Sequence, residues 1–138
     1  MSPPGFDPTV DETIESSHEA PAIARRCVGR LAAHIEASLL RDMQLLVSEI
    51  VTNSIRHSGS DDPIRLRVWT RRSGLKVEIA DGGYGFEAGS VGSGDYAEGG
   101  RGLMIVDALA DRWGVSHDAR AHVWFELSSR SVSRAQAG

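Results

Sequence analysis

The sequence LLVSEIVTNSIRHS, residues 45–58, decides the fold of this chain, because its polar and apolar residues separate by helical spacing. Glu49, Asn53 and His57 stand four residues apart, and positions i, i+4 and i+8 lie along one face of a helix. The apolar residues between them predict a core-facing side for the same helix. The stretch therefore predicts a packed helix that carries a carboxylate, an amide and an imidazole along one stripe.

Outward from this helix, hydrophobic periodicity and turn residues predict another helix before it and a hairpin after it. Over 64–71, Ile64, Leu66, Val68 and Thr70 alternate with Arg65, Arg67, Trp69 and Arg71, which predicts a half-exposed strand. A second strand, 75–80, is expected to run back beside it after the turn Arg72-Ser73-Gly74. The elements that we expect are a strand over 13–17, helices over 19–34, 40–57 and 103–110, and strands over 64–71, 75–80, 113–116 and 122–127.

Strands joined by hairpins, with helices inserted between them, favour an α+β two-layer sandwich: a mostly antiparallel mixed sheet with helices on one face. The chain has 138 residues, the length of one domain with one core. We place that domain at 11–129. The Pro-rich polar residues 1–10 and the small polar residues 130–138 are expected to be flexible tails.

Charge and composition exclude several classes of protein. A net charge of -4 and a pI near 5.7 give no basic surface for nucleic acid. No run approaches the roughly 20 apolar residues of a membrane span, and the N-terminus lacks the features of a secretory signal. We therefore expect a cytoplasmic protein. The single cysteine, Cys27, has no disulfide partner and is expected to be a buried helix residue rather than a nucleophile.

Glu49 and Asn53 have the residue types and the spacing that phosphoryl transfer uses. A glutamate beside a phosphate site can take a proton from an attacking hydroxyl, so Glu49 is the candidate general base. Mg²⁺ needs few protein ligands when substrate phosphates supply the others, so the amide oxygen of Asn53 suffices for the metal. One helical turn, about 6 Å along the axis, separates the two residues, which suits a bridging ion and an entering nucleophile.

The glycine-rich stretch that follows supplies what a nucleotide needs. Asp81 ends an apolar strand, where its carboxylate can accept a hydrogen bond from an exocyclic amino group. Gly83 and Gly85 let the backbone approach a ring with no Cβ in the way. Further on, Gly100-Arg101-Gly102 opens a helix whose free backbone N–H groups form an anion site together with Arg101.

Each feature alone has a simpler explanation. A polar stripe on a helix is often a solvated surface, Asp-Gly after a strand is often a turn, and a glycine-rich loop is often only mobile. The order of the features along the chain favours a nucleotide site over these alternatives. The Walker phosphate loop and the dinucleotide fingerprint are both missing, and the five histidines show no metal-binding spacing.

These motifs resemble those of the GHKL ATPase superfamily, shared by gyrase, histidine kinases and MutL, whose domain has the Bergerat ATP-binding fold. Glu49-x-x-x-Asn53 with His57 is similar to the N box of that family, and Asp81-x-Gly83-x-Gly85 to its first glycine box. Gly100-Arg101-Gly102-Leu103 is similar to the second. The run GGRGLMIVDALADRWGV and the ending VWFEL look like the actinobacterial anti-sigma-factor serine kinases. The resemblance covers about Thr13 to Ser128.

The resemblance implies a role for each of these residues. Glu49 would be the catalytic base, Asn53 would hold Mg²⁺, and Asp81 would bind the adenine amino group of ATP. Residues 86–99 would form a lid over the nucleotide. The remaining nucleotide-binding residues implied by the motifs are Gly83, Gly85, Gly100, Arg101, Gly102 and Leu103.

Two positions depart from the family pattern. The last strand of the family usually begins with Gly-x-Thr, and the threonine reaches the adenine subsite. This chain has Arg120-Ala121-His122 there, and the sequence leaves open whether His122 replaces that hydroxyl. Relatives often carry Asn-Ala after the metal ligand, whereas this chain has Asn53-Ser54. Neither departure removes the base or the metal ligand.

The resemblance implies an ATP- and Mg²⁺-dependent serine/threonine kinase that acts as an anti-sigma regulator by phosphorylating a serine of an antagonist protein. About a dozen residues precede the first expected strand, so we expect no phospho-acceptor helix pair of a sensor kinase. The expected partners are therefore a sigma factor, the antagonist protein or both, and relatives commonly form homodimers. The alternative is an ATP-binding regulatory module that controls its partner by docking, without phosphotransfer.

Overall fold

The sheet of this protein is assembled in an order that differs from the order of its strands along the chain. The computed structural model describes residues 7–57, 61–81, 101–117 and 121–128. Its five-stranded sheet has the order β1-β2-β3-β5-β4. The elements are β1 (Asp7–Ile14), α1 (Ala20–Gly29), α2 (Ala37–His57), β2 (Ile64–Arg71), β3 (Gly74–Asp81), α4 (Arg101–Leu109), β4 (Arg112–His117) and β5 (Ala121–Ser128).

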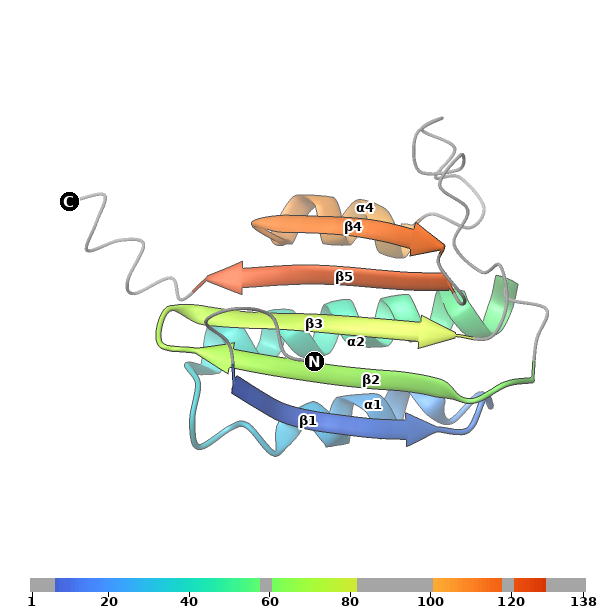
Figure 1. Cartoon of the computed structure of the whole chain (residues 1–138), viewed down its shortest axis with the longest axis horizontal. Helices are drawn as coiled ribbons and strands as arrows, with labels where there is room; N and C mark the ends of the chain where they lie inside the picture. The colour runs from blue at the N-terminus through green and yellow to red at the C-terminus, as the bar shows by residue number, and fades with distance from the viewer. Residues whose placement is uncertain (1–6, 58–60, 82–100, 118–120, 129–138) are drawn as a thin grey trace.

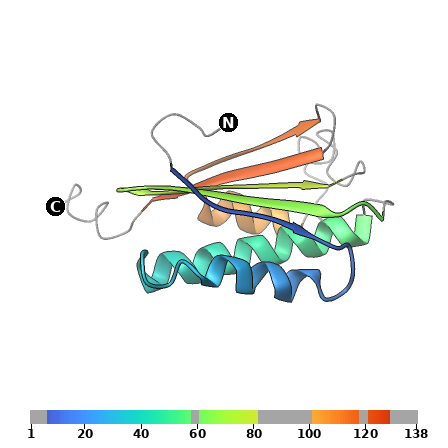
Figure 2. The ribbon, with the colours of Figure 1, turned by 60° about the horizontal axis from the view of Figure 1, so that its bottom comes forward.

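All strand pairings in the described ranges are antiparallel. Figure 1 looks onto the sheet, and Figure 2 shows α1, α2 and α4 together on one of its faces. The expected α+β two-layer sandwich is therefore confirmed. Alternation places one set of side chains of each strand against the helices and the other set on the open face.

Helix α2 is the centre of the helical layer and lies between α1 and α4 (Figure 1). It has 21 residues and is about 31 Å long, enough to cross the whole sheet. Its core-facing residues were correctly predicted, because helical spacing puts them on one side: Met43, Leu46, Val47, Ile50 and Val51 have no exposed surface. Each such side chain contributes roughly 1.5–3 kcal/mol through its burial.

The strands complete the core from the other layer. Ile64, Leu66 and Val68 of β2 are buried, as are Val77 and Ile79 of β3. Their register pairs Leu66 with Ile79 and Val68 with Val77, so apolar residues stand opposite one another on the helix-facing side. The alternation in the sequence predicted both strands, the first with its observed ends.

Two boundaries near the N-terminus differ from our prediction. Strand β1 covers Asp7–Ile14 rather than 13–17, so residues 7–10 belong to the sheet and not to the expected tail 1–10. Among residues 9–14 of this strand, only Val10 and Ile14 are buried, which gave too weak a pattern to locate the strand. Helix α1 ends at Gly29 rather than at residue 34, because the backbone tightens into i to i+3 hydrogen bonds such as Leu31 to Val28.

The open face of the sheet carries charged and aromatic residues in contact with one another. Arg67 pairs with Glu78, and the ammonium of Lys76 lies 4.7 Å from the centre of the Trp124 ring. A Cβ at Gly114 would lie 2.7 Å from the Trp124 indole nitrogen, so the glycine makes room for that ring. No described helix is long and apolar enough to cross a membrane.

Candidate functional site

Three elements converge at one end of the sandwich. The C-terminal half of α2, the end of β3 and the beginning of α4 lie at the same edge, on the right in Figure 1. Helix α2 carries Glu49 and Asn53, strand β3 ends with Asp81, and helix α4 begins with Arg101. The fold therefore brings together sequence motifs that are separated by more than a third of the chain.

The carboxylate of Asp81 is fixed by a residue of α2. Asp81 is the last residue of β3 and lies on the helix-facing side, with 2% of its surface exposed. The hydroxyl of Ser54, itself 1% exposed, donates a hydrogen bond of 2.6 Å to Asp81 Oδ2. Bonds from a hydroxyl to a carboxylate are short and strong. A carboxylate offers about four lone-pair positions, so a carboxylate oriented in this way can serve further donors.

Asn53 precedes Ser54 and is also buried, with 5% of its surface exposed. Within the described residues its amide nitrogen, Nδ2, is buried and has no hydrogen-bond partner. Burying a donor without a partner costs about 1–3 kcal/mol. An unsatisfied buried amide is a group that a polar ligand would complete, with an acceptor oxygen on Nδ2.

Glu49 lies one helical turn before Asn53 and is half-buried. The turn places it nearer to the middle of α2, on the same stripe as the amide. Its partial exposure lets its carboxylate meet a group that enters from solvent, which a fully buried carboxylate could not do. The stripe predicted from the sequence therefore exists, but at Asn53 it enters the protein interior rather than remaining a solvated face.

The other residues of the predicted site are described less completely. The backbone of Arg101, Gly102 and Leu103 forms the first turn of α4, at the same edge as Asp81. Gly83, Gly85, Gly100 and the expected lid 86–99 lie outside the described residues. His57 is the last residue of α2, in agreement with its place at the end of the motif. The structure assigns it no role.

The structure answers the question that the sequence left open at His122. In the sheet register, Ala121 pairs with Asp81 and His122 pairs with Ala80. Successive residues of a strand face opposite sides, so His122 is on the open face. There its Nδ1 lies 3.7 Å from Glu78 Oε1. His122 therefore does not take the place of the threonine hydroxyl at the adenine subsite, and the residue opposite Asp81 is an alanine.

The arrangement fits a nucleotide with a magnesium ion. The orphaned Nδ2 of Asn53 suits a phosphate oxygen, while its carbonyl oxygen is a ligand type that Mg²⁺ accepts. The Asp81 carboxylate suits an amino group on a ring. The described residues contain no group of three or more His, Cys, Asp or Glu side chains that could hold a metal, but an ion bound mainly by phosphates and water does not need one.

Ser54 is the site residue whose role the sequence did not reveal. In the sequence, Ser54 stands out only as a departure from the family pattern. A polar residue on the buried side of an amphipathic helix nevertheless indicates a buried hydrogen bond. Buried polar groups are nearly always hydrogen-bonded, so such a position predicts a partner in the core. The identity of that partner depends on the register of β3 against α2, which the sequence does not contain.

Comparison with known proteins agrees with this geometry. A family model described as a histidine kinase-like ATPase domain matches residues 13–127, which include both motif-bearing ends of α2 and β3 as well as the start of α4. No match is found among curated proteins.

Proposed function

The chain belongs to the histidine kinase-like ATPase family, and from this membership we propose that it is an ATP- and Mg²⁺-dependent serine/threonine protein kinase. Its substrate is a serine of a small antagonist protein, and through that protein it regulates a sigma factor in the cytoplasm. The observation that carries the proposal is the buried amide of Asn53, whose Nδ2 has no hydrogen-bond partner among the described residues. Glu49 lies one turn before it on α2, and the next residue, Ser54, holds the Asp81 carboxylate.

Three side chains have separate roles in this proposal. Asp81, held by Ser54, accepts a hydrogen bond from the adenine amino group. Asn53 faces the phosphates and supplies an amide oxygen to Mg²⁺, which neutralises phosphate charge when it is bound. Glu49, the most exposed of the three α2 positions 49, 53 and 54, meets the hydroxyl of the incoming serine.

Transfer is then a displacement at the γ-phosphorus. Glu49 takes the hydroxyl proton as the serine oxygen forms its bond to phosphorus. The bond between the γ-phosphorus and the oxygen bridging to the β-phosphate breaks, and ADP leaves. Phosphorylation adds a charge of about -2 to the antagonist, and this change in charge releases the sigma factor or captures it.

The test is phosphotransfer from labelled ATP to purified antagonist, with calorimetry of ATP and ADP binding in parallel. Replacement of a general base costs about 10²–10⁴-fold in rate. Glu49→Ala is therefore expected to lose transfer by that factor and to retain ATP binding. Glu126→Gln is the control, because Glu126 is a half-buried carboxylate of β5 on the open face of the sheet, opposite the helical layer that carries the motif. Undiminished transfer by Glu49→Ala would refute Glu49 as the base.

A second candidate function is a nucleotide-dependent docking module that performs no transfer. The observation in its favour is that His122, at the position of the family's threonine, lies on the open face of the sheet beside Glu78 and supplies no hydroxyl toward Asp81. Binding of ATP with no transfer to any serine of the antagonist would favour this second function. Absence of nucleotide binding would exclude both.

A further inference from the structure

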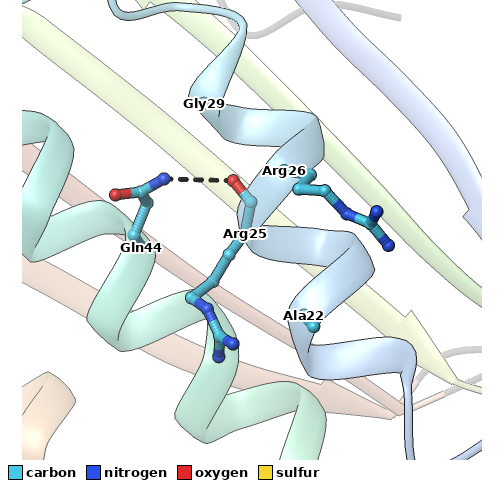
Figure 3. Close-up of a pocket in the computed structure, with 5 residues that line it drawn as sticks. All are labelled: Ala22, Arg25, Arg26, Gly29 and Gln44. Carbon is cyan, nitrogen blue, oxygen red and sulfur yellow. Dashed lines mark hydrogen bonds between the residues drawn. The ribbon is translucent and has the colours of Figure 1, made fainter.

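The seam between α1 and α2 contains a shallow depression of about 570 Å³. Figure 3 shows it from the helical side, with the strands behind the helices. It is lined by Ala22, Arg25, Arg26, Gly29 and Gln44. Gln44 donates a hydrogen bond of 3.1 Å from its Nε2 to the Arg25 carbonyl, which ties the two helices together and keeps the depression open.

A second depression of about 320 Å³ continues the seam toward the candidate site. His18 and Pro21 contribute from the beginning of α1, and Thr52 and Arg56 from the later turns of α2. Pro21 is adjacent in sequence to Ala22 of the first depression. On α2, Gln44 and Thr52 are two turns apart, about 12 Å along the axis. The two depressions follow one another along the seam between the helices, and together they are called the α1–α2 groove.

Among the described residues, the α1–α2 groove is lined by arginines and by no carboxylate. Arg25, Arg26 and Arg56 line it, all three exposed, together with His18. Within the described ranges none of these arginines is in an ion pair, whereas Arg30 is bound to Glu12. On a chain with a net charge of -4, such a groove is complementary to an acidic surface.

Glu49 does not line the α1–α2 groove, but the second depression reaches Thr52, its neighbour on α2. Glu49 precedes Thr52 by three residues, and residues three apart are neighbours on a helix surface. Leu45, next in sequence to Gln44, is 42% exposed and offers an apolar contact on the same helix. A polypeptide laid along the groove is therefore brought close to Glu49 by contacts that are not part of the nucleotide site.

We propose that the α1–α2 groove docks an acidic segment of the protein whose serine receives the phosphate. The inference rests on the proposed kinase function for the identity of the partner. The arginines attract and orient the segment, so that its serine reaches Glu49. The surface thus contributes selectivity for acidic substrates, which the buried nucleotide site cannot provide.

The experiment uses the full chain and a library of serine-centred peptides of equal length, with flanking residues drawn from an acidic pool rich in Glu or from a neutral pool rich in Gln. Binding is measured by fluorescence anisotropy and phosphorylation by transfer from ATP. The wild type is expected to bind the acidic pool at least about tenfold more tightly than the neutral pool, an advantage that weakens as salt increases.

The test variant is the double charge reversal Arg25→Glu with Arg56→Glu. Arg72→Glu is the matched control, because Arg72 is exposed in the turn between β2 and β3 and lines neither depression of the groove. The double variant is expected to lose the acidic preference and to keep its ATP affinity and melting temperature, while the control keeps the preference. Equal binding of the two pools by the wild type, or an undiminished preference in the double variant, would overturn the inference.

The two proposals fail in different ways. Acidic binding without any phosphotransfer removes the kinase function and leaves the groove as a docking surface. Phosphotransfer with no acidic preference removes the groove and leaves the kinase. A change in oligomeric state of the double variant, measured by light scattering, would assign the groove to a second copy of the chain and overturn docking of an acidic substrate.

Discussion

Replacement of Ser54 by alanine tests the most buried polar contact of the site. The substitution removes the hydroxyl that donates to Asp81 Oδ2 over 2.6 Å, and both residues are almost fully buried. Hydrogen bonds to charged groups contribute about 1.5–3 kcal/mol to stability. Alanine regains up to roughly 0.5 kcal/mol through its higher helix propensity. The free energy of unfolding should therefore fall by about 1–3 kcal/mol.

Urea unfolding followed by circular dichroism measures this loss directly. For a domain of this size each 1 kcal/mol lowers the melting temperature by about 3–5 °C, so thermal scans should show a decrease of about 3–15 °C. ATP affinity should fall as well, by about 5–10-fold, because the Asp81 carboxylate loses the bond that fixes its orientation. Calorimetry of ATP binding, well below the melting temperature, measures the second effect.

Ser48→Ala is the matched control, since it makes the same chemical change six residues earlier on α2. The Ser48 hydroxyl donates only to the Leu45 carbonyl of its own helix. Its replacement should change stability by no more than about 0.5 kcal/mol in either direction. Equal unfolding free energies for the two variants would refute the stabilising role of the Ser54–Asp81 bond. Destabilisation with unchanged ATP affinity would refute its role in binding.

Three further outcomes follow from other parts of the molecule. Gly74→Ala should lower the free energy of unfolding by about 1–3 kcal/mol in urea titrations, because its Cβ would lie 2.1 Å from the Leu127 carbonyl oxygen of β5. Burial raises the pKa of the Cys27 thiol, so at pH 8 iodoacetamide should alkylate the native protein at least about tenfold more slowly than the urea-unfolded chain, as mass spectrometry can show. The Arg65 guanidinium, which forms two hydrogen bonds with the Asp11 carboxylate, lowers the pKa of Asp11 below its ordinary value of 3.8. Because the pKa of Asp11 is lower in the folded than in the unfolded chain, the pair stabilises the fold at neutral pH, and this stabilisation is lost as the carboxylate is protonated in acid. The pair is exposed, so Asp11→Asn should cost at most about 1 kcal/mol at pH 7 and progressively less as the pH falls below 4.

The parts of the fold that the sequence predicted are those with a strong local period. Helix α2 repeats its buried residues over several turns, and β2 buries Ile64, Leu66 and Val68 at alternate positions, so both were located from their own residues. The spacing of Glu49 and Asn53 fixed their common stripe in the same way. Such features depend on the backbone geometry of a single element, which every short segment contains.

The parts that the sequence did not predict depend on pairing between distant segments. Strand β1 buries two of its residues 9–14 and has a register shift between Pro8 and Val10, so its pairing with β2 defines it more than its own pattern does. The face of His122 illustrates the same limit, since a shift of one residue in register reverses the side to which a strand residue points. Both questions were settled only by the assembled sheet.

Two buried polar residues of α2, Asn53 and Ser54, favour a binding site in its C-terminal half over a solvated surface. Consecutive helix residues point about 100° apart, so burying both Asn53 and Ser54 places two polar groups within the core. Ser54 is satisfied by Asp81, 27 residues away, whereas the Asn53 amide has no partner among the described residues. A donor left in this state opposes folding by about 1–3 kcal/mol, an amount that a ligand can recover on binding. The free-energy cost of burying the Asn53 amide without a partner therefore favours binding of an acceptor such as a phosphate oxygen. The hydrogen bond between its neighbour Ser54 and Asp81 fixes the Asp81 carboxylate for the same ligand.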